Sequence, residues 1–388
     1  MMSEEPGWSG DVMGQFYMEH PEYRIGPNPK SWYERAQNWA IPEVRDYKFA
    51  LMKEIIDNYD IDGFELDFLR HCSLFQLERT TPEQRKEIMT RFVAKVRKAL
   101  DDSSKPGEHK WLCVRIPSYL DTHDALGIDV RQLVSAGVDM VNLSGFFFME
   151  PQNDLGKIVK LIPDTPVYIE MNHIIQSGKN VAKHRHGSFT FRRATENQFY
   201  TTAHLAYAQG ATGVSMFNFA YYRDNGVPGR GPFHEPPFHI FKHLGDKAWI
   251  AQQDQHYILT KAGNTPPSKT RQLPKEFTKG VTQSIKMFMA EPTGGWKQNG
   301  KLRIESDKLL GDSKWAVTFN RVSLKETSDR SEPYETPYQN LLGEEGQYRA
   351  FVVPFDIVKN GNNDIQVTMI DGKLKYKIIF MDIAIKYG

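Results

Sequence analysis

The chain has 388 residues, of which 40% are hydrophobic and 25% are charged. This length exceeds the usual size of one domain, so we expect either two domains or one large barrel with an added module. The 49 Lys and Arg residues nearly balance the 48 Asp and Glu residues, which excludes a global charge field that would attract nucleic acid or an anionic membrane. The expected partner is therefore a neutral or locally recognised ligand, and the oligomeric state is left open.

The two cysteines and the N-terminal residues bear on disulfide bonding, metal binding and the cellular location of the protein. Cys72 and Cys113 are too few for a multi-bridge framework, and neither lies in a metal-ligand spacing such as CxxC. The first residues, MMSEEPGWSGDVMG, lack a basic segment followed by an apolar core, and no apolar run of about 18 residues occurs. We expect a secreted or periplasmic protein if a signal peptide was removed, and a cytoplasmic one otherwise.

Helical and extended patterns alternate along the first two thirds of the chain. Residues 42–60 begin at a proline suited to a first turn and carry apolar side chains at helical spacing, at Val44, Tyr47, Leu51 and Ile55. Strands are then expected over 63–68, 111–117, 138–145, 166–172 and 213–219, with helices over 82–102, 129–137, 154–163 and 195–210. No GxGxxG follows any strand, which favours a (β/α)8 (TIM) barrel over a dinucleotide-binding open sheet.

The strand count leaves this barrel incomplete. Five strands are evident between residues 60 and 220, and the first 40 residues have room for about one more. Either the N-terminal segment supplies irregular strands, or the barrel lacks strands at its N-terminal side.

From about residue 270 the pattern changes to period-two runs broken by turn residues, such as WAVTFNRV and NDIQVTMI. These runs predict an all-β module, most simply a sandwich or a jelly roll. The polar, proline-rich segment TKAGNTPPSKTRQLPKE marks the boundary. The predicted domains are a barrel at 1–262 and an accessory β-sandwich at 263–388.

Two acids interrupt the apolar run GFELDF. Residues two apart in a strand point the same way, so Glu65 and Asp67 share one face while Phe64, Leu66 and Phe68 share the other. The apolar set suits the helix-facing side, which places the acids toward the barrel axis and Asp67 near the mouth, where active sites of this fold lie. The alternative is structural: Glu65 pairs with an inward cation such as Arg115.

The strand PVYIEMN repeats this theme. Tyr168, Glu170 and Asn172 are in phase, with Glu170 near the C-terminal end. Carboxylates on separate barrel strands can face one another across the mouth, as glycoside hydrolysis requires. The alternative is a structural glutamate bonded to Asn142 or Arg115. The candidate saccharide-binding residues are the polar and aromatic side chains near these strand ends: Arg115, Asn142, Asn172, His173, Asn218 and Tyr221.

No metal site and no cofactor are predicted. The loops after the later strands contain His184, His186, His234 and His239, but no HExxH or equivalent spacing occurs among them.

The stretches HPEYRIG, WAIPEVRDYKFALMKEIIDNYDIDGFELDF and VYIEMN resemble the glycosyl-hydrolase-like, family-10-like barrel proteins of polysaccharide-degrading bacteria, over about residues 14–245. The resemblance implies a barrel that acts on glycans, with Glu65, Asp67 and Glu170 at its mouth. In such proteins HPEYRIG follows earlier barrel strands, whereas here it begins near residue 20, in agreement with a missing barrel front. The segment GNNDIQVTMIDG with KIIFMDIAIKY is similar to galactose-binding-like sandwiches.

The predicted function is hydrolysis of a glycosidic bond in a poly- or oligosaccharide by a carboxylate pair. The alternative is a non-catalytic glycan-binding protein built on the same barrel. A sugar isomerase or epimerase is a third reading, and it would require a metal cluster that the sequence does not show.

Overall fold

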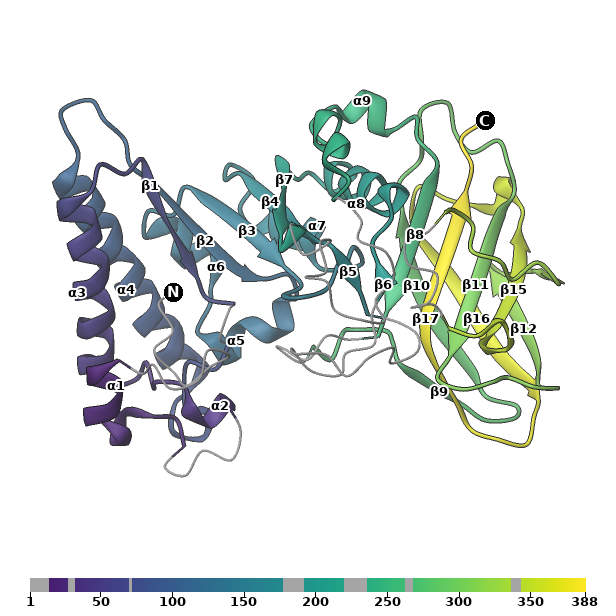
Figure 1. Cartoon of the computed structure of the whole chain (residues 1–388), viewed down its shortest axis with the longest axis horizontal. Coiled ribbons are helices and arrows are strands. Elements are labelled where there is room, and N and C mark those ends of the chain that lie inside the picture. The colour runs from purple at the N-terminus through teal and green to yellow at the C-terminus, as the bar shows by residue number, and fades with distance from the viewer. Residues whose placement is uncertain are drawn as a thin grey trace. The chain divides into compact units, whose positions relative to one another are not determined.

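A computed structural model describes residues 14–26, 32–69, 72–176, 192–219, 236–261, 268–335 and 343–388. The residues group into two compact units (Figure 1). The first contains Met1–Phe146, Asp154–Tyr168 and Thr265–Ser268, and the second contains Phe147–Asn153, Ile169–Asn264 and Lys269–Gly388.

Five strands form one sheet in the order β1-β2-β3-β4-β7. Their bounds are β1 Gly63–Asp67, β2 Trp111–Pro117, β3 Met140–Ser144, β4 Val167–Asn172 and β7 Gly213–Phe217. β1 and β3 both pair with β2 in parallel, and the register places Asp67 opposite Arg115 and Arg115 opposite Asn142. The mixed α/β class is thus confirmed, but the described residues contain an open row of five strands and no closed eight-stranded barrel.

The helices of this part alternate with its strands as expected. They are α1 Gln15–Glu19, α2 Trp32–Arg35, α3 Pro42–Asn58, α4 Pro82–Ser103, α5 His123–Leu126, α6 Val130–Ser135, α7 Leu155–Leu161, α8 Glu196–Ala208 and α9 Lys247–Ile250. α4 and α8 each begin with a capping box, formed by Thr81 with Gln84 and by Thr195 with Gln198.

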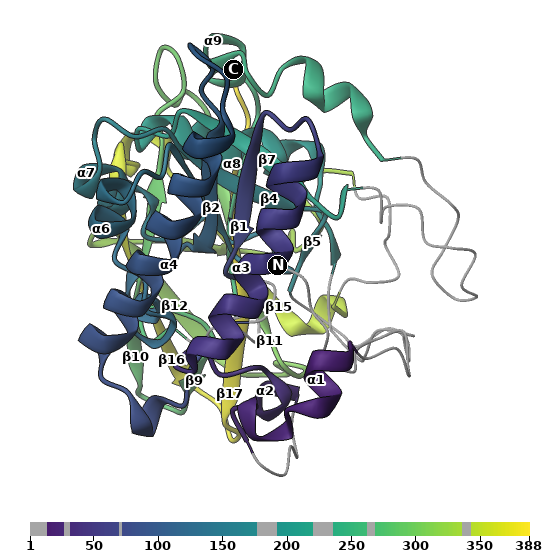
Figure 2. The same cartoon turned by 90° about the vertical axis from the view of Figure 1, so that its left-hand side faces the viewer.

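Figure 2 shows α3 and α4 side by side in front of β1 and β2. Leu66 of β1 and Phe68, just after the strand, are buried, and Trp39 meets Phe68 and Phe92 edge to face at centroid distances of 6.2 and 5.0 Å. The apolar side of β1 therefore faces these helices, as the alternation in GFELDF predicted.

The buried stripe of α3 differs by about one residue from the expected one. It consists of Val44, Lys48, Met52 and Ile56, whereas Tyr47, Leu51 and Ile55 are half-buried. The ring of Tyr47 stacks instead on Phe16 of α1, 4.0 Å between centroids. The row that contains Val44 and Lys48 therefore points inward, and the neighbouring row that contains Tyr47 contacts α1.

Two antiparallel sheets form most of the second unit. Their orders are β10-β16-β12-β13 and β14-β15-β11-β17-β8, with β9 also paired to β17. The bounds are β8 Gln255–Thr260, β9 Lys275–Phe277, β10 Thr282–Met289, β11 Gly300–Ser306, β12 Lys314–Phe319, β13 Val322–Ser323, β14 Lys325–Thr327, β15 Tyr348–Val353, β16 Gly361–Asp371 and β17 Tyr376–Ile385; a short hairpin adds β5 Ile174–Ile175 and β6 Arg192–Arg193.

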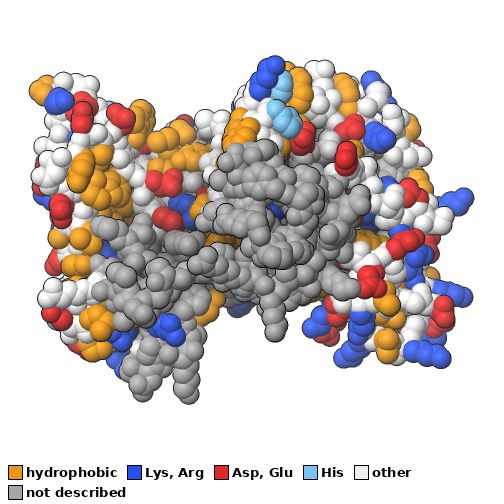
Figure 3. Space-filling view, in the orientation of Figure 1, with side chains coloured by type: hydrophobic (Ala, Val, Ile, Leu, Met, Phe, Trp, Pro, Cys, Tyr) orange, Lys and Arg blue, Asp and Glu red, His pale blue; other side chains and the backbone are white. Residues whose placement is uncertain are grey.

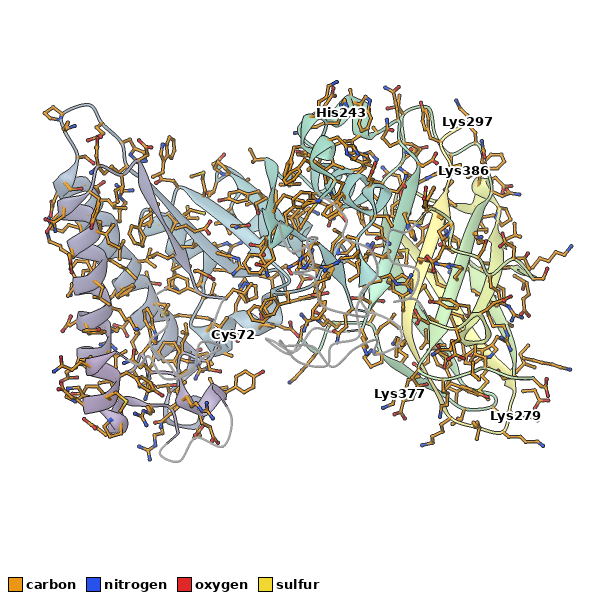
Figure 4. All side chains as sticks on the ribbon, viewed as in Figure 1. Cys72, His243, Lys279, Lys297, Lys377 and Lys386 are labelled. Atoms are coloured by element: carbon orange, nitrogen blue, oxygen red, sulfur yellow. The ribbon has the colours of Figure 1, made fainter. Side chains whose placement is uncertain are left out.

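One hydrophobic core is shared by both sheets and contains residues from β10, β11, β12, β16 and β17. Figure 4 marks the two ends of this module by exposed lysines, with Lys297 and Lys386 at one end and Lys279 and Lys377 at the other. β8 lies before the expected boundary at residue 262, yet it pairs with β17 along its whole length and packs against α8. The C-terminal sheet therefore includes a strand from the sequence preceding the linker.

Candidate functional site

The face of β1 opposite the helices carries Glu65 and Asp67. Register places Cys113 and Arg115 of β2 beside them, and Asn142 of β3 next in line. Figure 3 shows acidic and basic side chains next to each other over β1 and β2. The phase of the acids is therefore as predicted, and a cation lies among them.

Arg115 holds Asp67 in a two-point ion pair. Nη1 of Arg115 donates to both carboxylate oxygens of Asp67 at 3.1 Å each, and Nη2 donates to Oγ of Ser144 at 3.0 Å. The side chain of Arg115 is 3% exposed, whereas that of Asp67 is 23% exposed. The guanidinium thus fixes the orientation of a carboxylate that still reaches solvent at the C-terminal end of β1.

The loops after β1 and β3 reinforce this arrangement. The backbone N–H of Leu69 donates to Oδ1 of Asp67 at 2.9 Å, and that of Phe146 donates to Oγ of Ser144 at 3.0 Å. Phe146 has a φ of 68°, a left-handed conformation that is uncommon for an aromatic residue. Asp67 and Ser144 are therefore held by backbone N–H groups as well as by Arg115.

Glu65 has different neighbours. The thiol of Cys113 donates to Oε2 of Glu65 at 3.2 Å, and the hydroxyl of Tyr168 lies 2.9 Å from that sulfur and 3.5 Å from the same carboxylate oxygen. Burial raises the pKa of Cys113 to about 12 and also raises the pKa of Tyr168, so both act as neutral donors at neutral pH. The structural alternative predicted Arg115 as the partner of Glu65, but Arg115 binds Asp67 instead.

Sequence reasoning missed the role of Cys113, which it treated as an ordinary thiol. Its side chain is in phase with Arg115 two residues later on β2, and that phase was the available signal. Neither cysteine forms a disulfide; Cys113 is buried, and Cys72 is half-buried in the coil after β1 (Figure 4).

The predicted residues on β4 are buried. Glu170 is 8% exposed and Asn172, the last residue of β4, is 1% exposed. His173 follows them, and its backbone carbonyl accepts from the N–H of Ala194 at 2.9 Å. Burial, with a smaller contribution from Arg193, lowers the pKa of His173 well below its ordinary value, so the ring is neutral at neutral pH.

The remaining predicted residues lie on β3 and after β7. Asn142 is the third residue of β3 and is buried. Asn218 directly follows β7, is half-buried and has a φ of 53°, a conformation in which Asn is enriched. Tyr221, His184, His186 and His234 lie outside the described residues. His239 lies 2.9 Å from Glu196 in an exposed pair.

Among the described residues, no group of three or more His, Cys, Asp or Glu residues is placed to hold a metal ion. None of the helices in this described part combines the length and the apolar character needed to cross a membrane.

No protein-family profile matches the chain, and no curated protein matches it. Several solved glycoside hydrolases are similar at low identity. Catalytic domain 2 of the Group II chitinase of Ostrinia furnacalis, solved with a chitooligosaccharide, is 11% identical with a TM-score of 0.37, covering 53% of this chain and 72% of that chain. Endo-glycoceramidase II from Rhodococcus sp. is 11% identical with a TM-score of 0.35, covering 95% and 77%. A β-porphyranase of glycoside hydrolase family 86 from Bacteroides plebeius is 11% identical with a TM-score of 0.24, covering 79% and 74%.

Proposed function

We propose that the protein is a glycoside hydrolase in which Glu170 works with Asp67 or Glu65 as the carboxylate pair. The observation that supports this most directly is the fixed orientation of Asp67, which Arg115 holds at the C-terminal end of a parallel strand while the carboxylate still reaches solvent. In parallel α/β folds, the C-terminal ends of strands are where reactive side chains are placed. A sugar bound there would meet a carboxylate whose geometry is already set.

The other polar residues of these strands would orient the saccharide. Buried Asn and His side chains at strand ends can hydrogen-bond hydroxyl groups in a partly desolvated site. We assign this role to the predicted set, Arg115, Asn142, Asn172, His173, Asn218 and Tyr221.

The domain assignment belongs to the same proposal. Residues 1–262 would form the catalytic part of a (β/α)8-type, family-10-like barrel, and residues 263–388 an accessory sandwich of the galactose-binding-like type. The two antiparallel sheets with a shared core are compatible with a sandwich. Secretion would match an extracellular polysaccharide substrate.

The test is release of reducing sugar from a panel of plant and algal polysaccharides, followed by substitution. Glu170→Gln and Asp67→Asn are each expected to reduce turnover by about 10²-fold or more, as loss of an acid or base group does. Glu54→Gln, on an exposed position of α3, is the matched control and should retain full activity. Unchanged turnover in Glu170→Gln, with release of sugar by the parent protein, would remove Glu170 from the assignment.

A non-catalytic glycan-binding protein is the second candidate. The same ion pair is also compatible with binding alone, because Arg115 engages both oxygens of Asp67 and the two groups can hydrogen-bond hydroxyls without reacting. This alternative predicts saturable binding of an oligosaccharide that is recovered intact after long incubation. Recovery of shortened products would exclude it.

A further inference from the structure

A pocket of about 420 Å³ lies on the helical side of the first unit, away from the face of β1 that carries the acids. It is lined by the segment before α3, by α3 and α4, and by the short helix η2, Leu77–Arg79. Its volume falls within the range of small-molecule sites, roughly 300–1,000 Å³. Ala40, Ile88 and Phe92 supply an apolar part of the lining.

The charged side chains that line this pocket are mostly cationic. Four cationic side chains, Arg45, Arg79, Arg91 and Lys95, face two acidic ones, Asp46 and Glu87, which leaves two positive charges in excess. The whole chain has a net charge of only +1. The excess is therefore a local property of the pocket.

The acids neutralise two of the four cations. Nζ of Lys95 lies 2.9 Å from Oδ1 of Asp46, and Arg91 pairs with Glu87 one turn earlier on α4. Arg45 and Arg79 have no carboxylate within 4.0 Å among the described residues. The excess charge therefore rests on these two arginines.

Arg45 is the half-buried member of this pair. Its guanidinium donates to the backbone carbonyl of Trp39, and burial lowers its pKa from the ordinary value. A cation in this position has lost part of its hydration, and the nearby carboxylates of Asp46 and Glu43 offset this loss only in part. An oxyanion supplied by a ligand would restore the missing interaction and would be bound by charge-assisted hydrogen bonds.

We propose that this pocket binds an acidic sugar unit, with its carboxylate or sulfate on Arg45 and Arg79 and its ring against Ile88 and Phe92. The anion part follows from the pocket alone, and the sugar part rests on the proposed glycosidase function. The pocket would then lie outside the reaction centre and select acidic glycans over neutral ones.

The probe is glucuronic acid, with glucose as its neutral counterpart, titrated into the full chain by calorimetry. We expect glucuronic acid to bind at least about tenfold more tightly than glucose, the ratio that corresponds to one charge-assisted hydrogen bond. The double variant Arg45→Gln/Arg79→Gln should lose this advantage, and raising the salt concentration should weaken it. Because Arg45 also contacts Trp39, the single variant Arg79→Gln, at an exposed position, provides a second test that spares the fold.

The matched control is Lys53→Gln/Lys98→Gln, which removes two cations from α3 and α4 that do not line the pocket. It should bind glucuronic acid like the parent chain. Equal binding of glucose and glucuronic acid, no binding of either, or an equal loss in the control would overturn the proposal. Calorimetry requires no turnover, so an inactive protein that binds glucuronic acid would contradict only the proposed function.

Discussion

The two units hold their charged residues in different ways. In the first unit Asp67 keeps 23% of its side chain exposed beside Arg115, whereas in the second unit Arg303 and Asp382 are 1% and 0% exposed. Nη1 of Arg115 binds both oxygens of Asp67, whereas Asp382 accepts from Nε of Arg303 at 3.1 Å and lies 2.9 Å from Nε2 of His256. The two carboxylates therefore differ in burial and in the kind of side chains that surround them.

This buried network extends well beyond one pair. Arg303 also reaches Glu332 at 2.9 Å, and Glu332 in turn lies 3.3 Å from Arg192, whose other amino group bonds Glu305 at 2.9 Å. A buried charge is costly unless it is paired and hydrogen-bonded on every side, and such a network is tolerated when its members satisfy one another. On the sheet face of the first unit solvent still reaches Asp67, so its carboxylate keeps part of its hydration beside Arg115.

The largest test of this contrast is Arg303→Met. The substitution removes the shared partner of Asp382 and Glu332 and should lower the free energy of unfolding by about 3–5 kcal/mol, measured by urea denaturation. Lys301→Met on the same strand, β11, removes a pair with the 58% exposed Asp329 and a hydrogen bond to Ser331 at 3.2 Å, and should cost less than about 1 kcal/mol. Similar losses of unfolding free energy in the two variants would show that burial does not determine how much an ion pair contributes to stability.

The second-largest effect should come from acid, which should lower the contribution of the buried network to the free energy of unfolding. Burial alone would raise the pKa of Asp382, but Arg303 and His256 reverse this effect and hold the pKa well below its ordinary value. A carboxyl with a lowered folded-state pKa stabilises the fold above its unfolded-state pKa, and this stability is lost as the pH falls toward the folded-state value. The free energy of unfolding should therefore decrease as the pH is lowered from about 4, with a slope of up to about 1.4 kcal/mol per pH unit for this group.

The pH dependence of the free energy of unfolding needs a control variant, because Glu305 changes this free energy with pH in the direction opposite to Asp382. Burial, opposed by Arg192, raises the pKa of Glu305, so its contribution favours the fold at low pH and declines as the pH rises through the raised value. Asp382→Asn, less stable at neutral pH, should show a shallower slope below pH 4 than the parent chain. An unchanged slope would remove Asp382 as its source.

A smaller effect is expected from Asp67→Asn. Arg115 loses its charged partner but keeps Ser144, and the amide oxygen of Asn can still accept, so the cost should be about 1–3 kcal/mol in urea denaturation. Asp62→Asn, at an exposed position just before β1, is the control and should change stability by less than about 0.5 kcal/mol. A loss as large as that of Arg303→Met would contradict the difference between the units.

The smallest effect should come from Lys53→Met on α3. Lys53 and Asp57 form an exposed pair four residues apart at 2.7 Å, and such pairs contribute about 0.3–0.5 kcal/mol. Thermal unfolding in low and high salt should show this difference only in low salt. A loss above about 1 kcal/mol would mean that exposure does not weaken ion pairs here.

Local patterns predicted most elements of the fold. The helix expected over 82–102 is Pro82–Ser103, because proline, a capping box and a continuous apolar stripe all act within a few residues. The strands expected over 111–117 and 166–172 are Trp111–Pro117 and Val167–Asn172. β8 was missed because all six of its residues are buried, so no alternation marks it.

The site was predicted less completely than the fold. Alternation placed Glu65 and Asp67 on one face, but which acid Arg115 would bind depends on the register of two strands that are 43 residues apart in sequence, and no local signal encodes that register. Arg192 lies on β6 and belongs to the buried network around Glu305, and no local pattern marked it as a member of such a network. Partners chosen by tertiary packing are not visible in local periodicity.

The position of β8 decides how this protein could be divided. A fragment beginning at residue 263 would omit β8 and expose the backbone of β17 from Phe380 to Ile385, and it would also remove His256 from Asp382. An uncovered strand edge of this kind is a template for self-association, so such a fragment should aggregate where one that begins before Gln255 stays monodisperse. The C-terminal module that could be moved intact to another protein therefore begins before β8, the strand that pairs with β17. The proline-rich linker lies inside this module and does not mark its start.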